Sequence, residues 1–133
     1  MTIAKLYDFP ARGDGQGSLV VMDQSCGVPF DIKRAYYIFG STKGVSRGFH
    51  AHRALHQIAV CITGSCRMVI DDGFSREDAH LDSPSKAIDL PPMLWHEMHD
   101  FSTDCVLLVL ASDYYDEGDY VRDYFEFKEL IGV

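Results

Sequence analysis

Apolar residues alternate with polar ones along most of the chain, and a period of two is typical of β-strands that are half buried in a sheet. Strand-like segments occur at residues 3–9, 18–23, 34–39, 56–63, 66–71, 86–90 and 104–111. Turn residues, chiefly glycine, proline and aspartate, separate these segments. Short strands at such regular spacing predict an all-β sandwich or barrel.

Two stretches stand out against this pattern. The connection Thr63-Gly64-Ser65 joins two apolar segments with almost no slack, which predicts a tight hairpin. Residues 119–130 have apolar side chains at helical spacing after the acidic pair Asp116-Glu117, so we expect one short C-terminal helix. Because the chain has no internal repeat, low-complexity tract or long linker, residues 1–133 are expected to form a single domain.

The composition is that of a folded domain, and its charge narrows the class of ligand. Of the 133 residues, 47% are hydrophobic and 24% are charged, which is too apolar for a disordered chain. Twelve lysines and arginines against twenty aspartates and glutamates give a net charge of −8. That balance argues against nucleic acid as a partner, because its backbone is bound by a concentrated basic surface. A small phosphorylated ligand remains compatible, since a few arginines can hold it.

The apolar runs and the cysteines indicate where in the cell the protein is expected to work. The longest apolar run, residues 106–111, is far shorter than the roughly 20 residues that cross a bilayer. Residues 1–15 show no apolar signal segment, so we expect a cytoplasmic protein without a membrane partner. The cysteines are Cys26, Cys61, Cys66 and Cys105. They form no C-x-x-C pair, and reduced, buried cysteines are therefore favoured over disulfides.

Histidines form the densest cluster of candidate chemistry. In the run Arg47-Gly48-Phe49-His50-Ala51-His52, the two histidines are two residues apart and so project from the same face of a strand. A third, His96, follows the turn Pro91-Pro92. A lone histidine is more often structural, and we keep that interpretation for the others, which are His56, His80 and His99.

The spacing of these residues resembles the two motifs of the cupin family. The first motif corresponds here to His50, His52, Gln57 and Gly64. The second corresponds to Pro91, Met93, His96 and Asp100. The resemblance implies a jelly-roll β-barrel whose concave interior carries the site.

Gln57 departs from the cupin pattern, because metal-dependent cupins hold their ion with three histidines and a glutamate. An amide in place of the carboxylate removes a negative charge and a strong ligand for hard cations. Three imidazoles can still bind zinc, whereas histidines without a metal suit acid–base work. We favour the second interpretation and expect neither metal nor cofactor.

A second resemblance is tighter and spans residues 4–131. The matching blocks are residues 33–39, 47–53, 64–73, 95–102 and 111–117. They are similar to the sugar-nucleotide 3,4-ketoisomerases, which move the carbonyl of dTDP-4-keto-6-deoxy-D-glucose from C4 to C3 without a metal. The resemblance implies a role in making 3-amino-3,6-dideoxy sugars. It also implies a homodimer that exchanges N-terminal strands.

Such an isomerisation needs a base for the C3 proton, an acid at C4 and donors that stabilise the enediolate. His50 and His52 can serve as base and proton shuttle, and of the two we favour His52 as the base. Tyr37 is the candidate acid or oxyanion donor, with Tyr36 as its competitor. Arg47 would place a fixed cation near the developing charge.

Four further residues are candidates for binding substrate. They are Arg67, Trp95, His96 and Gln57. Arg67 would hold the diphosphate, although a solvated strand arginine explains it equally well. Trp95 would stack on thymine or the sugar, as would Phe49, although both residue types are more often core.

Two other functions stay open on the same fold. One is a metal-dependent or epimerase-like cupin enzyme, and the other is a cupin that binds a dTDP-sugar without reacting. The sequence leaves the C4 configuration of the product open, with residues 40–46 and the order of the two histidines as candidates for setting it.

Overall fold

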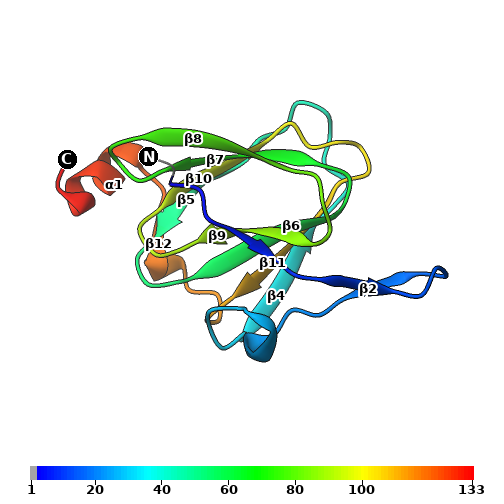
Figure 1. Ribbon diagram of the computed structural model, residues 1–133. Helices are drawn as coiled ribbons and strands as arrows, with labels where there is room; N and C mark the ends of the chain where they lie inside the picture. The colour runs from blue at the N-terminus through cyan, green and yellow to red at the C-terminus, as the bar shows by residue number, and fades with distance from the viewer. Residues whose placement is uncertain (1–2) are drawn as a thin grey trace.

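The computed structural model describes residues 3–133, which form two facing β-sheets and a short C-terminal helix (Figure 1). The strands are β1 (Leu6–Asp8), β2 (Ala11–Gly13), β3 (Ser18–Val20), β4 (Arg34–Ile38), β5 (Arg47–His52), β6 (Gln57–Thr63), β7 (Cys66–Asp71), β8 (Arg76–Leu81), β9 (Lys86–Leu90), β10 (Trp95–His99), β11 (Val106–Ala111) and β12 (Tyr120–Val121). The helical elements are the 3₁₀ turns η1 (Gln24–Cys26) and η2 (Glu117–Asp119) and the helix α1 (Tyr124–Ile131).

Each sheet contains five antiparallel strands. Their orders are β1-β9-β6-β11-β4 and β12-β5-β10-β7-β8. Strands β2 and β3 pair with each other and extend away from the barrel as a ribbon (Figure 1). The predicted antiparallel jelly-roll barrel with a short C-terminal helix is therefore confirmed.

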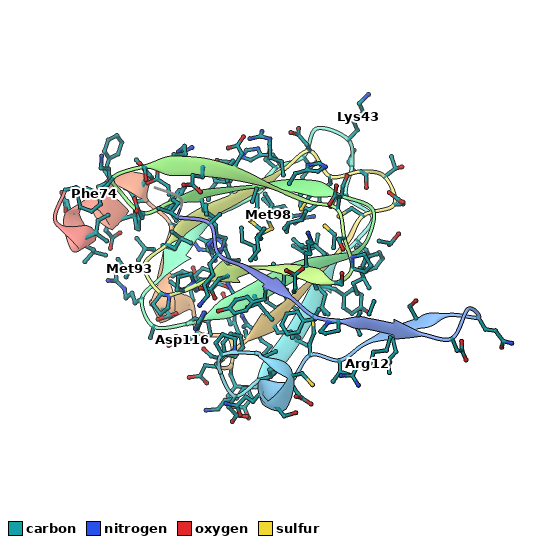
Figure 2. The ribbon with its side chains drawn as sticks, in the orientation of Figure 1. Arg12, Lys43, Phe74, Met93, Met98 and Asp116 are labelled. Atoms are coloured by element: carbon teal, nitrogen blue, oxygen red, sulfur yellow. The ribbon has the colours of Figure 1, made fainter. Side chains whose placement is uncertain are left out.

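The main core lies between the two sheets, where inward and outward residues alternate along each strand. On β6, Ala59 and Cys61 face this core, whereas Ile58 and Val60 pack in a second cluster on the outer face. Met98 of β10 points into the space between the sheets (Figure 2). Burying one large aliphatic side chain stabilises the fold by about 1.5–3 kcal/mol. Because the apolar residues recur at every second position, they are buried only when the two sheets face each other, which favours the closed barrel.

The strand predictions miss β2 and β8 and give no bounds for β5 and β10. All but the last residue of β10 are buried, so its sequence Trp-His-Glu-Met-His shows no apolar alternation. Strand β8 lies at a sheet edge and is mostly polar, with burial that alternates only weakly. The predicted strands at residues 3–9 and 18–23 are shorter, at Leu6–Asp8 and Ser18–Val20.

The predicted hairpin at Thr63-Gly64-Ser65 is wrong. Strands β6 and β7 belong to different sheets, so this tight connection closes one end of the barrel instead of pairing its two strands. Gly64 has a φ of +70°, and a Cβ there would lie 2.4 Å from Ser102 Oγ. The connection is only two residues long, and residues on both sides of it, Cys61 and Cys66, are buried in the same core.

The C-terminal helix begins later than residue 119. Residues 117–121 form η2 and β12, where Val121 is buried and pairs with Ala51 of β5. Helix α1 begins after Asp123, whose carboxylate accepts hydrogen bonds from the backbone N–H groups of Phe125 and Glu126. Within the described range 3–133, no helix has both the length and the apolarity to cross a membrane.

Candidate active site

Three histidines from neighbouring strands meet inside the barrel. His50 and His52 lie on β5, and His96 lies on β10 directly opposite His50. The ring centroid of His50 lies 4.6 Å from that of His96 and 4.9 Å from that of His52. Their ligand nitrogens all lie within 4.8 Å of one another. The structure therefore brings the three motif histidines together.

A β-bulge shapes this cluster. His50 pairs with His96 while Gly48 pairs with Glu97, so Phe49 is an extra residue on β5. Phe49 has a φ of 59°, which is unusual for a bulky side chain. The bulge turns the Gly48 carbonyl toward the His50 ring, and His50 Nδ1 donates a hydrogen bond to it over 3.0 Å.

That hydrogen bond fixes the tautomer of His50. A backbone carbonyl can only accept, so Nδ1 carries the proton and Nε2 keeps its lone pair. His96 is arranged in the same way, because its Nδ1 donates to the Leu94 carbonyl over 3.2 Å. His52 is different, since neither of its buried ring nitrogens has a hydrogen-bond partner among the described residues. Its Nδ1 lies 3.5 Å from Asp119 Oδ2, too far for a good hydrogen bond.

All three imidazoles are neutral at pH 7. Burial lowers the pKa of His52 to about 4, helped by the nearby His50 and only partly opposed by Asp119. Burial also lowers the pKa of His50. For His96, burial and the other two rings lower the pKa well below its usual value. A neutral imidazole with a free lone pair can accept a proton, which is what a general base needs.

The bulge is supported from the outer face of the sheet. The Phe49 ring meets His99 edge-on at a centroid distance of 5.5 Å. His99 Nε2 donates to Glu97 Oε1 over 2.9 Å, and its Nδ1 lies 2.7 Å from Ser46 Oγ. Trp95 Nε1 donates to the other oxygen of Glu97 over 2.8 Å. These contacts on the outer face therefore stabilise the β5 bulge, which in turn positions His50 within the histidine cluster.

Tyr36 and Gln57 extend the cluster toward the opposite sheet. The Tyr36 hydroxyl donates to Gln57 Oε1 over 2.7 Å, and Gln57 Nε2 is buried without a partner among the described residues. Burial raises the pKa of Tyr36 to about 12, so the phenol stays protonated. The Arg34 guanidinium lies 5.0 Å from the Tyr36 ring centroid, while its buried Nε is unpaired within the described chain. The unpaired Arg34 Nε and the unpaired Gln57 amide nitrogen are polar groups that a bound ligand could satisfy.

The segment before α1 forms the other wall. The Tyr120 ring lies 4.4 Å from the His52 ring and 4.9 Å from the His50 ring, measured between centroids. The Arg122 guanidinium lies 4.2 Å from the Tyr120 ring centroid. Glu117 accepts two hydrogen bonds from Arg122, over 2.8 and 3.0 Å, which fix this cation over the ring.

A pocket with an empty volume of about 480 Å³ opens beside His52. Its wall includes Arg34, Asp119 and Tyr120. A second hollow is lined by Arg34 and Tyr120 together with Tyr36 and Tyr115, so the two share a border. His52, the tyrosines and Arg34 therefore line these adjoining hollows, and the His50 ring lies next to His52.

Several residues predicted from sequence do not join the cleft. Tyr37 lies on the outer face of its sheet with 63% of its surface exposed, because neighbouring residues on a strand point to opposite sides. Arg67 lies outside and forms ion pairs with Asp78 and Asp100. Trp95 packs on the outer face against Tyr124 of α1.

The structure places the three remaining predicted site residues, Arg47, Gln57 and His96, differently. Arg47 is exposed at the start of β5 and forms no ion pair within the described residues. Gln57 is 1% exposed and accepts the hydrogen bond from Tyr36, and the buried His96 completes the histidine cluster. The structure therefore groups His50, His52, His96 and Gln57 with Tyr36, the competing tyrosine.

Sequence reasoning missed Arg34, Glu117, Tyr120 and Arg122 as site residues. Arg34 could have been found, because it is two residues before Tyr36 and therefore shares its face. The other three could not, since they were assigned to the helix or to its acidic start.

Metal binding is compatible with the three imidazoles but has little further support. The nitrogens are close enough to share a zinc ion. The position of the usual cupin carboxylate belongs to Gln57, whose oxygen is already occupied by the Tyr36 hydroxyl. His50, His52 and His96 are the residues that would hold an ion.

Comparison with known proteins identifies the family. The chain matches the family model described as "FdtA: WxcM-like, C-terminal" over residues 2–132. The chain belongs to the FdtA family. A curated relative, the TDP-4-oxo-6-deoxy-alpha-D-glucose-3,4-oxoisomerase of Aneurinibacillus thermoaerophilus, is 51% identical over 127 residues, covering 96% of this chain and 91% of the relative.

Solved structures of 3,4-ketoisomerases superpose closely on this FdtA-family chain. The TDP-fucose-3,4-ketoisomerase of Campylobacter jejuni has a TM-score of 0.93 and 34% identity, covering 98% of this chain and 97% of its own. A histidine-to-asparagine variant of the 3,4-ketoisomerase QdtA from Thermoanaerobacterium thermosaccharolyticum, in complex with TDP-4-keto-6-deoxyglucose, has a TM-score of 0.94 and 38% identity. It covers 98% of this chain and 96% of its own. The family is thus one of cupin-fold isomerases, as the sequence resemblance implied.

Proposed function

We propose that this chain is a sugar-nucleotide 3,4-ketoisomerase that moves the carbonyl of TDP-4-keto-6-deoxyglucose from C4 to C3. The observation that carries the proposal is the neutral histidine cluster. In it the bulge gives His50 a basic Nε2, and the His50 ring lies against His52 and Tyr120, which line a cleft that also contains the Arg34 guanidinium. The relatives support the substrate, since QdtA holds TDP-4-keto-6-deoxyglucose in its solved complex.

His50 is the base in this proposal, which reverses our preference for His52. Its Nε2 is available because Nδ1 is engaged by Gly48, whereas no hydrogen bond among the described residues fixes the tautomer of His52. His50 is also half-buried, while His52 is only 3% exposed. Nε2 of His50 takes the C3 proton and later returns a proton to C4.

The oxygens also exchange a proton, since the C3 hydroxyl becomes a carbonyl and the C4 carbonyl becomes a hydroxyl. His52 lies beside His50 and has no fixed tautomer, so it can receive the proton on one nitrogen and release it from the other. Tyr120 borders both rings and is a candidate donor to the enediolate. A donor preorganised in a water-poor site can contribute about 3–4 kcal/mol to such a transition state.

Arg34 replaces Arg67 as the proposed anion-binding residue. Arg67 is already paired with two carboxylates outside the barrel, whereas the Arg34 Nε is buried and unpaired within residues 3–133. A guanidinium is suited to phosphate because it presents several donors in one plane.

A homodimer, working in the cytoplasm, is also part of the proposal. The β2–β3 ribbon projects from the barrel and carries Leu19 with 61% of its surface exposed. On the outer face of the β4 sheet, Tyr37 and Phe39 are exposed and touch at a centroid distance of 5.9 Å. Exposed apolar side chains of this kind are typical of surfaces that associate.

The test is conversion of TDP-4-keto-6-deoxyglucose in D₂O, followed by NMR. We expect a 3-keto product with deuterium on C4, because the proton passes through an exchangeable imidazole. Conversion without deuterium would exclude the histidine route, and absence of conversion by the folded protein would refute the proposed function.

A metal-dependent cupin enzyme is the second candidate, because the three imidazoles can share an ion. Chelation separates the two. The metal-free proposal expects full turnover after exhaustive chelation, whereas loss of turnover that zinc restores would favour the metal-dependent enzyme.

A further inference from the structure

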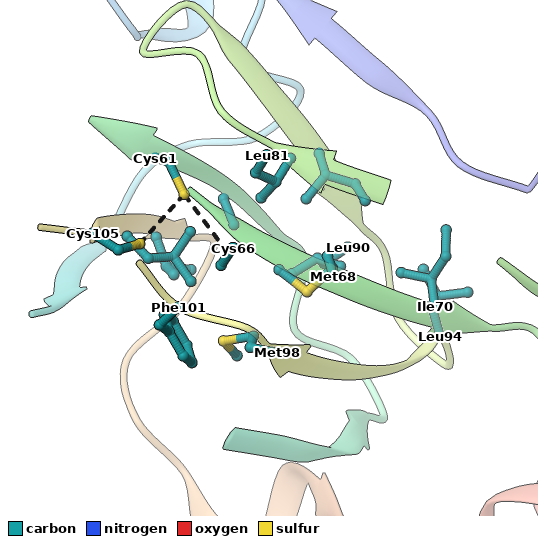
Figure 3. Close-up of a cluster of buried hydrophobic side chains, with 14 residues drawn as sticks. Cys61, Cys66, Met68, Ile70, Leu81, Leu90, Leu94, Met98, Phe101 and Cys105 are labelled. Atoms are coloured by element: carbon teal, nitrogen blue, oxygen red, sulfur yellow. Dashed lines mark hydrogen bonds between the residues drawn. The ribbon is translucent and has the colours of Figure 1, made fainter. Parts of the chain in front are cut away.

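Three of the four cysteines converge at one end of the core (Figure 3). Cys61 comes from β6, Cys66 begins β7, and Cys105 immediately precedes β11. The Cys61 Sγ lies 3.7 Å from the Cys66 Sγ and 3.6 Å from the Cys105 Sγ. All four cysteines are free in the structure. Cys26 is exposed, in contrast to the burial predicted for the cysteines, and stands apart from this trio.

The surroundings of the thiol trio are apolar. Leu81, Met98 and Phe101 pack in the same cluster. Among residues 3–133, no lysine or arginine side chain is buried, so no cation lies in this core. Hydrogen bonding to Cys66 and burial raise the pKa of Cys61, and burial raises the pKa of Cys105 to about 12. An apolar core without a cation disfavours buried thiolate anions that are not neutralised by a bound ion.

We propose that Cys61, Cys66 and Cys105 form a binding site for a trivalent metalloid hydroxide, of which arsenous acid is the simplest. Three arsenic–oxygen bonds break and three arsenic–sulfur bonds form. Each thiol proton leaves with a hydroxide as water, so three waters are released and nothing is oxidised or reduced. The product is a neutral trithiolate, in which arsenic caps the triangle of sulfurs.

Charge decides which soft ion the site selects. Three thiolates around a monovalent copper or a divalent zinc ion would leave net negative charge in a core that holds no cation among the described residues. Burying an uncompensated charge is strongly unfavourable. A trivalent metalloid leaves no net charge and needs no fourth ligand, whereas zinc prefers four.

The entry route follows from the closure of this end of the barrel. The tight β6–β7 connection is held by Ser65 N–H, which donates to Ser102 Oγ over 2.9 Å, and by Ser102 N–H, which donates to the Ser65 carbonyl over 2.9 Å. Thr63 and Asp104 beside it are exposed. Opening these bonds exposes the thiols, so uptake should be slow and limited by local opening.

The experiment titrates the reduced, folded protein with arsenite. We expect one arsenic per chain by mass spectrometry, near-ultraviolet absorption from arsenic–sulfur bonds, and three thiols lost to a thiol reagent while one stays reactive. Cys66→Ala should weaken binding at least about tenfold, the low end of what loss of a supporting group costs a metal site. Cys105→Ala serves as a second variant if Cys66→Ala fails to fold.

The matched control is Cys26→Ser, which removes the exposed cysteine outside the trio. It should leave arsenite affinity unchanged and abolish the one reactive thiol that remains. Binding by the unfolded chain only, binding that depends on Cys26, or zinc binding as tight as arsenite binding would each overturn the proposal. Turnover is not used as a readout, so the outcome is independent of the proposed ketoisomerase.

Discussion

Replacing His50 by asparagine tests whether His50 is the base that acts on carbon while His52 carries the proton between the two oxygens. The asparagine amide can still donate to the Gly48 carbonyl, so the bulge is retained while the basic Nε2 is removed. Loss of a general base costs about 10²–10⁴-fold in kcat, which corresponds to roughly 3–5 kcal/mol of transition-state stabilisation. Because His50 acts on carbon, His50→Asn should also abolish deuterium incorporation at C3 of unreacted substrate.

The matched variant is His52→Asn. In our mechanism His52 moves only the oxygen-bound proton, so this variant should lose product formation while it still exchanges the C3 hydrogen with solvent. The assay is NMR of substrate and product in D₂O, with TDP binding measured in parallel to show that the cleft is intact. If His52→Asn abolished C3 exchange and His50→Asn retained it, the tautomer argument would be wrong and the original preference for His52 would stand.

Three further predictions address the surrounding structure. Tyr36→Phe should destabilise the fold by about 1–3 kcal/mol in urea unfolding, because it leaves the Gln57 amide buried without its partner, whereas the exposed Tyr37→Phe should be neutral. Asp123→Ala should cost about 1 kcal/mol in the same assay by removing the N-cap of α1, and an unchanged midpoint would contradict that role. The free energy of unfolding should fall as pH drops below about 6.5, because histidines whose pKa the fold lowers, such as His52, are then protonated in the unfolded chain but not in the folded one. An unfolding free energy that does not change between pH 7 and 5 would show that these histidines are not held neutral by the fold.

The pairing of the two histidines that we propose to be catalytic was determined by the sequence alone. His50 and His52 are two residues apart, and any extended strand places such residues on one face. The same period of two predicted the barrel, because apolar residues on one face of each strand are buried only when two sheets pack face to face. The third histidine was found through its motif spacing, since β10 is buried on both faces and shows no alternation.

The choice between Tyr36 and Tyr37 needed the tertiary structure. Both are aromatic neighbours on β4, so the local pattern suits either orientation, and only the packing of β4 beside β11 shows that Tyr36 points inward. The same holds for Arg34, whose place in the cleft follows from that orientation.

The remaining wall of the cleft also depended on long-range contacts. Tyr120 and Arg122 lie in a segment with helical spacing, yet β12 pairs with β5 and brings Tyr120 opposite His52. The bulge at Phe49 likewise results from the pairing of β5 with β10, about 50 residues apart in the chain. Strand pairing over such separations is set by the closure of the whole barrel, which local sequence does not encode.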